Sequence, residues 1–147
     1  MWAQFSFLIT GTLGTWWLGS FWPIHLMNGI GSAVLWVSSL VLYEWSRRTI
    51  WGQGLFIAWN YHVPDHVIET GPYAYIRHPI YLSYLIAFLA LFVAIPRMQT
   101  LVILLFNMIL YFHAALSDER NLADSPLAPE YASYKARTGR FFPYRLR

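Results

Sequence analysis

The sequence predicts an all-helical integral membrane protein with four transmembrane helices, a helical hairpin, and a short cytoplasmic loop and C-terminal segment. Of its 147 residues, 57% are apolar and 12% are charged, whereas about a quarter of the residues in a soluble domain are charged. Residues 1–43 contain no Asp, Glu, Lys or Arg, and Arg97 is the only such residue between positions 79 and 115. Helices of a soluble bundle carry polar faces, so a soluble bundle is the less favoured interpretation.

The composition also excludes several classes of protein. The high apolar content excludes a disordered chain, a coiled coil and a nucleic-acid-binding module, so we expect no nucleic-acid partner. The chain has no cysteine, which excludes disulfides, thiolate metal sites and cysteine nucleophiles.

Each predicted span approaches the roughly 20 residues that a helix needs to cross a bilayer. The first span ends before Pro23, and the third ends before Pro96. Because Pro96 and Arg97 leave only a tight link, the third and fourth spans form the hairpin. We treat residues 1–147 as a single membrane-embedded domain. The four spans are residues 3–22, 25–43, 79–95 and 98–117.

The basic residues predict the orientation in the membrane. Four spans put the loop 44–78 and the tail 118–147 on one side, which holds nine of the ten basic residues. Basic residues concentrate on the cytoplasmic side, so we expect a multi-pass protein of a bacterial inner membrane, surrounded by membrane lipids, with both termini in the cytoplasm. Glycines in the first two spans permit close helix contacts within or between chains, which leaves the oligomeric state open.

A polar motif precedes the third span, in the run Gly71–Tyr81. His78 comes directly before Pro79 and therefore favours an extended backbone, while the proline suits the first position of a helix. Arg77 and His78 thus lie at a helix N-terminus, where the helix dipole favours an anion. Taken alone, Arg77 is also typical of an arginine that extends to the membrane surface, and the tyrosines Tyr75, Tyr81 and Tyr84 of an interfacial aromatic belt.

A second polar set follows the fourth span. Asn107, Tyr111 and Asp118 recur at helical spacing and form a polar stripe on an apolar helix. The antiparallel hairpin brings the start of its first helix to the end of its second, so we expect Arg77 and His78 to lie close to Asp118 and Glu119. Two interpretations are open for this cluster: a structural ion pair that closes the hairpin, or a ligand site.

A site with Arg and His, a carboxylate and several tyrosines suits S-adenosylmethionine. The amino group of this compound pairs with a carboxylate, and its own carboxylate pairs with Arg or His. Its sulfonium favours aromatic faces through cation–π attraction of roughly 0.5–2 kcal/mol.

Three parts of the sequence together resemble the isoprenylcysteine carboxyl methyltransferase family. They are the run Gly71–Tyr81, the acidic pair Asp118-Glu119, and the tail residues Tyr131, Tyr134, Arg140, Phe141, Phe142 and Pro143. The sequence is also similar to the related phospholipid N-methyltransferases. The resemblance covers about residues 44–143 and implies a multi-span methyltransferase that uses S-adenosylmethionine as cofactor near the cytoplasmic face.

The resemblance also implies roles for particular residues. His78, Tyr81 and Glu119 would hold the cofactor, and Gly71 and Tyr75 would line it. Arg77 and Arg140 would orient the substrate or support the pocket, and we take them as the candidate catalytic residues. Three positions depart from the family pattern: Ser83 stands where glycine is usual, Asp118 where glutamate is usual, and Ser125-Pro126-Leu127 where Phe-Gly is often found.

The function expected from these features is methyl transfer from S-adenosylmethionine to a lipophilic small-molecule or lipid substrate. An isoprenylcysteine-like carboxylate, a small lipophilic acid or a thiol would be the acceptor. The alternatives are a phospholipid N-methyltransferase, an NADPH-dependent membrane reductase and a non-catalytic membrane scaffold. We expect no metal, because Pro64 disrupts the helical spacing that His62 and His66 would need to share a metal ion.

Overall fold

The computed structural model of the chain describes residues 26–51 and 66–143. This part of the chain is all-helical and contains no strand. The predicted first span, residues 3–22, lies outside the described residues, as do His62 and Pro64. The helices are α2 (Leu26–Trp51), the short 3-10 helix η1 (Gly71–Ala74), α3 (Pro79–Ala94), α4 (Met98–Ala123) and α5 (Ala128–Arg137).

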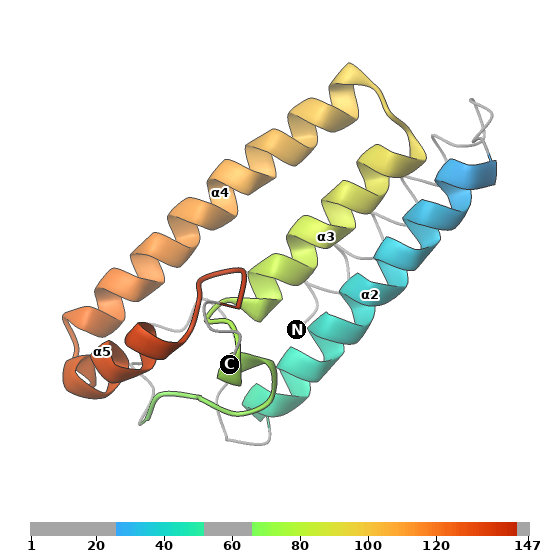
Figure 1. Ribbon diagram of the computed structural model, residues 1–147. Coiled ribbons are helices and arrows are strands. Elements are labelled where there is room, and N and C mark those ends of the chain that lie inside the picture. The colour runs from blue at the N-terminus through green and yellow to red at the C-terminus, as the bar shows by residue number, and fades with distance from the viewer. Residues whose placement is uncertain (1–25, 52–65, 144–147) are drawn as a thin grey trace.

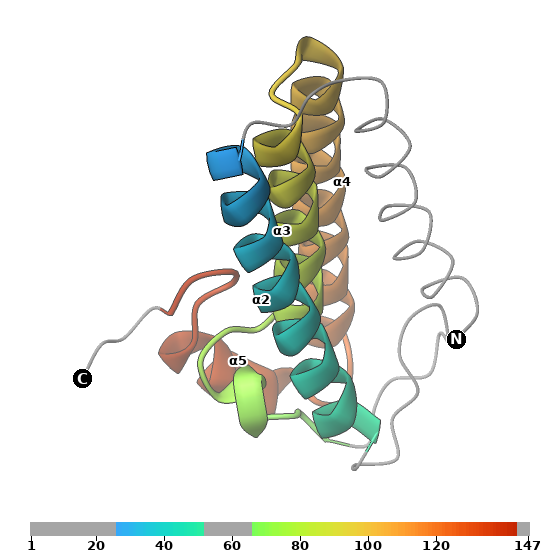
Figure 2. The ribbon, with the colours of Figure 1, turned by 90° about the vertical axis from the view of Figure 1, so that its right-hand side faces the viewer.

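The three long helices run side by side, with α3 between α2 and α4 (Figure 1). A view turned by 90° shows the same arrangement, with α5 at the end of the molecule where α3 begins (Figure 2). The predicted hairpin is confirmed, because α3 ends at Ala94 and α4 begins at Met98. Thr100 secures the link: its hydroxyl accepts a hydrogen bond from the Arg97 N–H at 3.2 Å and donates to the Ile95 carbonyl.

Small side chains line the contact between α2 and α3. On α2 three buried serines are spaced seven apart, and on α3 the buried residues after Ile80 are one serine and three alanines. The Ser39 hydroxyl donates to the Ser83 carbonyl at 2.7 Å, and both residues are fully buried. Small residues let helix backbones approach closely. The close contact between α2 and α3 therefore explains why a small residue, Ser83, stands at a position where glycine is usual. The seam consists of Ser32, Ser39, Ser46, Ser83, Ala87, Ala90 and Ala94.

Two helices extend beyond the predicted spans. α2 continues past Tyr43 to Trp51, and α4 continues past Ser117 to Ala123. The loop predicted to begin at position 44 is therefore helical in its first part. Glu44 forms ion pairs with Arg47 and Arg48, one helical turn further along the chain, and such pairs stabilise a solvated helix. Charged residues mark the end of an apolar span but do not end the helix.

The exposed surface of the long helices is strongly apolar, as the membrane prediction requires. Among the helices of the described residues, only α4 is both long and apolar enough to cross a membrane. α3 is apolar but has 16 residues, a length of about 24 Å, whereas the hydrocarbon core is about 30 Å thick. The predicted set of four transmembrane helices is therefore only partly supported. Large exposed apolar side chains include Val34, Val37 and Val41 on α2 and Val102, Phe106 and Ile109 on α4.

Candidate functional site

The segment before α3 pairs with the segment after α5. The Arg77 N–H donates to the Gly139 carbonyl at 2.8 Å, and the His78 N–H donates to the Arg140 carbonyl at 3.1 Å. Ile76 and Gly139 form an isolated parallel bridge. These contacts bring Arg77, His78 and Arg140 together at the start of α3.

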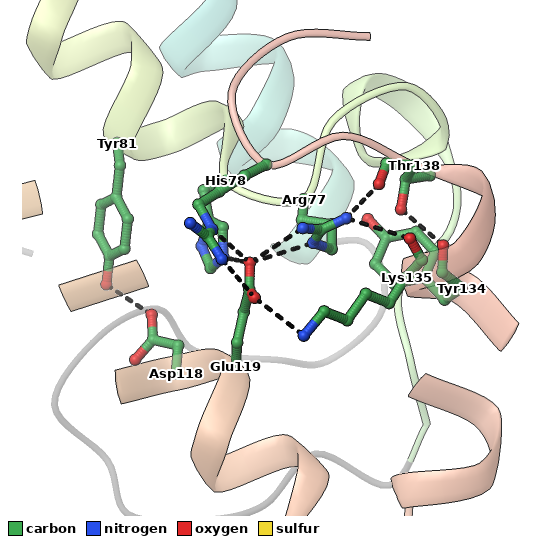
Figure 3. Close-up of polar contacts among 9 residues, drawn as sticks. Arg77, His78, Tyr81, Asp118, Glu119, Tyr134, Lys135 and Thr138 are labelled. Atoms are coloured by element: carbon green, nitrogen blue, oxygen red, sulfur yellow. Dashed lines mark hydrogen bonds and ion pairs between the residues drawn. The ribbon is translucent and has the colours of Figure 1, made fainter. Parts of the chain in front are cut away.

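Glu119 lies at the centre of this arrangement and is 3% exposed. Arg140 binds it with two nitrogens, Nε at 2.8 Å from Oε1 and Nη2 at 3.0 Å from Oε2. A nitrogen of Arg77 lies 3.2 Å from Oε1, and Lys135 Nζ lies 3.4 Å from Oε2. His78 Nε2 is 3.5 Å from Oε1. We call these five residues the Glu119 cluster; Figure 3 shows the side chains converging on the carboxylate.

The Glu119 cluster carries an excess of positive charge. Three formally charged side chains, those of Arg77, Lys135 and Arg140, surround one carboxylate. Burial alone would raise the pKa of Glu119, but the neighbouring His78 and Arg140, together with the charge of Arg77, hold the pKa well below its usual range. Glu119 is therefore ionised, and the cluster retains the capacity to bind an anion.

Arg77 also forms hydrogen bonds with the backbone of the C-terminal segment. Its side chain is 9% exposed and donates to the carbonyl groups of Lys135, at 3.3 Å, and of Thr138. The Thr138 hydroxyl in turn donates to the Tyr134 carbonyl at 2.7 Å (Figure 3). With five N–H donors and several partners already bound, Arg77 acts mainly to hold the C-terminal segment against α4.

A row of aromatic rings extends from the Glu119 cluster along the contact between α3 and α4. The His78 and Tyr81 rings are stacked, with centroids 5.5 Å apart and planes within 4°. The ring centroid of Tyr111 lies 5.5 Å from that of Tyr81 and 5.4 Å from that of Tyr84. The Tyr81 hydroxyl donates to Asp118 at 2.8 Å (Figure 3). The predicted polar stripe on α4 thus faces α3 at Tyr111 and Asp118.

Gly71 and Tyr75 lie differently from the other predicted site residues. Gly71 adopts a positive φ of 58°, and a side chain at this position would collide with Thr49 of α2. Tyr75 is 61% exposed. The described contacts of Glu119 do not include either residue. The close approach to Thr49 is enough to explain the glycine at position 71.

The sequence prediction gave no role to Lys135, which pairs with Glu119. It placed Asp118 near Arg77 and His78 but did not identify Tyr81 as its hydrogen-bond partner. The spacing of Lys135 four residues after Tyr131 on α5 could have signalled a shared helix face, but the sequence did not show which element this face meets.

Within the described residues, neither His78 Nε2 nor the buried Tyr131 hydroxyl oxygen makes a hydrogen bond, but His78 Nε2 lies at ion-pair distance, 3.5 Å, from Glu119 Oε1. Buried polar groups are nearly always satisfied, so the Tyr131 hydroxyl is a candidate for contact with a ligand. The described residues contain no group of three or more His, Asp or Glu side chains that could hold a metal ion. The site combines a cationic cluster, a carboxylate at Asp118 that accepts a hydrogen bond from Tyr81, and aromatic rings.

Comparison with known proteins gives one match. The family model described as phospholipid methyltransferase matches residues 19–125. No curated protein matches the chain, and no solved structure matches it. The matched region includes the motif before α3, the whole hairpin and the acidic pair, and it ends before α5.

Proposed function

The chain belongs to the phospholipid methyltransferase family, and we propose that it transfers a methyl group from S-adenosylmethionine to a lipophilic acceptor at the cytoplasmic face of a membrane. The observation that carries the proposal is the convergence of His78 and Glu119 at 3.5 Å, from the two ends of the hairpin that lies inside the matched region. As a membrane methyltransferase it would be multi-pass, with both termini in the cytoplasm of a bacterial inner membrane.

The residues present fit the groups that this cofactor carries. His78 offers a buried imidazole beside Glu119, and the cationic excess around Glu119 suits a carboxylate. Asp118, which accepts a hydrogen bond from Tyr81, offers a carboxylate to an ammonium group. The stacked rings of His78 and Tyr81 suit a sulfonium.

We assign the cofactor to His78, Tyr81 and Glu119, and we leave Gly71, which packs against Thr49, and the exposed Tyr75 out of this assignment. Glu119 acts in this assignment by holding its cations in place, since both of its oxygens are occupied by Arg140, Arg77 and Lys135. Arg140 retains donors for the substrate because its side chain is 25% exposed. Arg77 supports the site from a more buried position.

S-adenosylmethionine supplies a methyl group on a sulfonium, whose sulfur takes the bonding electron pair when a nucleophile attacks the methyl carbon. The protein contributes alignment of the two partners, exclusion of water and charge compensation. The cationic excess favours an acceptor that is itself anionic, such as an isoprenylcysteine-like carboxylate, a small lipophilic acid or a thiolate. Such an acceptor needs no general base, since it attacks in its ionised form.

A phospholipid amine is the second candidate acceptor, and the family match supports it no better than it supports an anionic acceptor. An amine arrives as an ammonium ion and must lose a proton before it can attack. Asp118 is the carboxylate that could take this proton, because it accepts only a neutral hydrogen bond from Tyr81 among its described contacts. The two candidates therefore place different demands on Asp118.

A binding measurement on the detergent-solubilised protein tests the proposal. We expect S-adenosylmethionine to bind and NADPH not to bind, because a membrane reductase would need further basic groups for the extra phosphates. His78→Phe keeps an aromatic ring against Tyr81 but removes the buried nitrogen, and it should weaken cofactor binding at least tenfold. His113→Phe, at an exposed position on α4, is the matched control. Equal affinity in the wild type and His78→Phe would refute the site assignment, and binding of neither compound would favour a scaffold.

A further inference from the structure

Tyr131 lies on α5, outside the region that the family model matches. Its side chain is 3% exposed and packs in a small core with Val67, Tyr134, Leu122 and Leu127. The hydroxyl oxygen is buried and has no hydrogen-bond partner within the described residues. A purely structural position in this core would be filled better by phenylalanine, because a buried hydroxyl without a partner is destabilising.

Contacts along two helices place this tyrosine beside the Glu119 cluster. Leu122, which follows Glu119 by one helical turn on α4, packs against the small core that contains Tyr131. Lys135 follows Tyr131 by one turn on α5, and its Nζ lies 3.4 Å from Glu119 Oε2. Residues three or four apart share a helix face, so the same faces of α4 and α5 carry Glu119, Lys135 and Tyr131.

The neighbouring tyrosine of α5, Tyr134, has a hydroxyl with a hydrogen-bond partner. Tyr134 is 4% exposed, and its ring centroid lies 6.1 Å from that of Tyr131. Its hydroxyl donates to the Tyr73 carbonyl at 2.7 Å and so joins α5 to η1. Of these two buried tyrosines, one thus has a structural partner and the other does not.

We propose that the Tyr131 hydroxyl is a ligand-binding group that donates a hydrogen bond to an anionic oxygen, a carboxylate, bound at the Glu119 cluster. This inference rests on the proposed function, because a carboxylate can come from the methyl donor or from a lipophilic acid acceptor. Arg77, Lys135 and Arg140 outnumber the one carboxylate of Glu119 and supply the charge that such a group needs. Burial and the nearby Glu119 raise the pKa of Tyr131 to about 12, which keeps the hydroxyl protonated as a donor.

The substitution Tyr131→Phe removes the hydroxyl and keeps the ring. We expect the affinity for the carboxylate ligand to fall about tenfold or more, as for other hydrogen bonds to charged groups. The melting temperature without ligand should stay the same or rise, because no protein hydrogen bond is lost. Tyr134→Phe is the matched control and should lower the melting temperature while leaving the affinity within twofold of the wild type.

Calorimetric titration of the detergent-solubilised chain with three probes distinguishes the source of the carboxylate. S-adenosylhomocysteine carries the carboxylate of the methyl donor, 5′-methylthioadenosine lacks it, and an S-farnesylated cysteine carries the carboxylate of an acceptor. If Tyr131→Phe weakens only S-adenosylhomocysteine, the hydroxyl binds the donor; if it weakens only the farnesylated cysteine, the hydroxyl binds the acceptor.

Two outcomes would overturn the inference, and they are distinguishable. If the wild type binds the probes and Tyr131→Phe binds all three with unchanged affinity, the hydroxyl is not a ligand-binding group, although the proposed function stands. If the wild type binds none of the probes, the proposed function fails, and the inference that rests on it fails too.

Discussion

The two sides of α3, which face α2 and α4, carry different kinds of side chains. Toward α2, most of the buried residues are small, the Ser39 hydroxyl donates to the Ser83 carbonyl, and one pair of rings, Tyr43 and Tyr84, meets with centroids 6.0 Å apart. Toward α4, the contact consists of tyrosine rings and a hydrogen bond from Tyr81 to Asp118, and it leads to the Glu119 cluster. The contact with α2 serves mainly for packing, whereas the contact with α4 leads to three cations around a single carboxylate. The difference separates an interface for packing from a region that has capacity for a ligand.

Glu119→Gln should have the largest effect, because it leaves three cations without their carboxylate. Removing one partner of a buried ion pair costs about 3–5 kcal/mol, and we expect the lower end because the Lys135 side chain is half exposed. Unfolding in detergent micelles measures this loss. Asp118→Asn, at the adjacent position, should cost about 1 kcal/mol, since it weakens one hydrogen bond. Equal losses for the two variants would contradict the central place of Glu119.

The stability difference between the wild type and Glu119→Gln should depend on pH in a defined way. The pKa of Glu119 in the folded protein lies below its ordinary value of 4.5, so its contribution is complete above that value. As the pH falls below about 4.5, protons bind the unfolded chain first, and the difference should shrink by about 1.4 kcal/mol per pH unit. Unfolding curves at pH 7, 5.5, 4.5 and 3.5 test this. A difference that vanished between pH 7 and 5.5 would show a raised pKa instead.

Ala90→Leu should disrupt the packing side of α3. Ala90 is fully buried in the seam against α2, and overfilling a packed interface costs about 1–3 kcal/mol. Leu89, the preceding residue, is 39% exposed, so Leu89→Ala serves as the control and should change stability by less than about 0.5 kcal/mol. The affinity for S-adenosylmethionine should be the same in both variants. A selective loss of cofactor binding in Ala90→Leu would contradict the assignment of packing to the α2 side of α3 and of ligand binding to the α4 side.

Ser39→Ala should have the smallest effect. It removes the hydroxyl that donates to the Ser83 carbonyl, and such bonds between membrane helices contribute on average about 0.6 kcal/mol. Ser38→Ala removes only a bond to Val34 of the same helix and is the control. The same unfolding assay compares them. A cost above about 2 kcal/mol for Ser39→Ala would show that the seam depends on this bond rather than on close packing.

The sequence predicted the hairpin because the absence of charges over 79–95 and 98–117 and the proline between them are local features. It also predicted that Arg77 and His78 meet Asp118 and Glu119, since an antiparallel hairpin requires it. The partner of each carboxylate was not predictable. Asp118 and Glu119 are adjacent in sequence, yet a helix directs neighbouring side chains about 100° apart, so one meets Tyr81 and the other meets the cations.

The C-terminal contributions were harder to foresee. Lys135 and Arg140 reach Glu119 only because α5 folds back beside α4 and because Arg140 pairs its backbone with His78. These contacts depend on the direction of the chain after Ala123, which the spacing of residues does not determine. The sequence does not indicate the helical extension to Trp51, because charged residues mark the end of an apolar span and not the end of a helix.

Transfer of a labelled methyl group tests the central claim most directly. Membranes containing the wild type, His78→Phe or His113→Phe are incubated with methyl-labelled S-adenosylmethionine, and the label is then measured in the lipophilic fraction. We predict labelled product with the wild type and His113→Phe and a loss of at least tenfold with His78→Phe. Label transfer that is equal in all three, or undetectable in the wild type, would contradict the account.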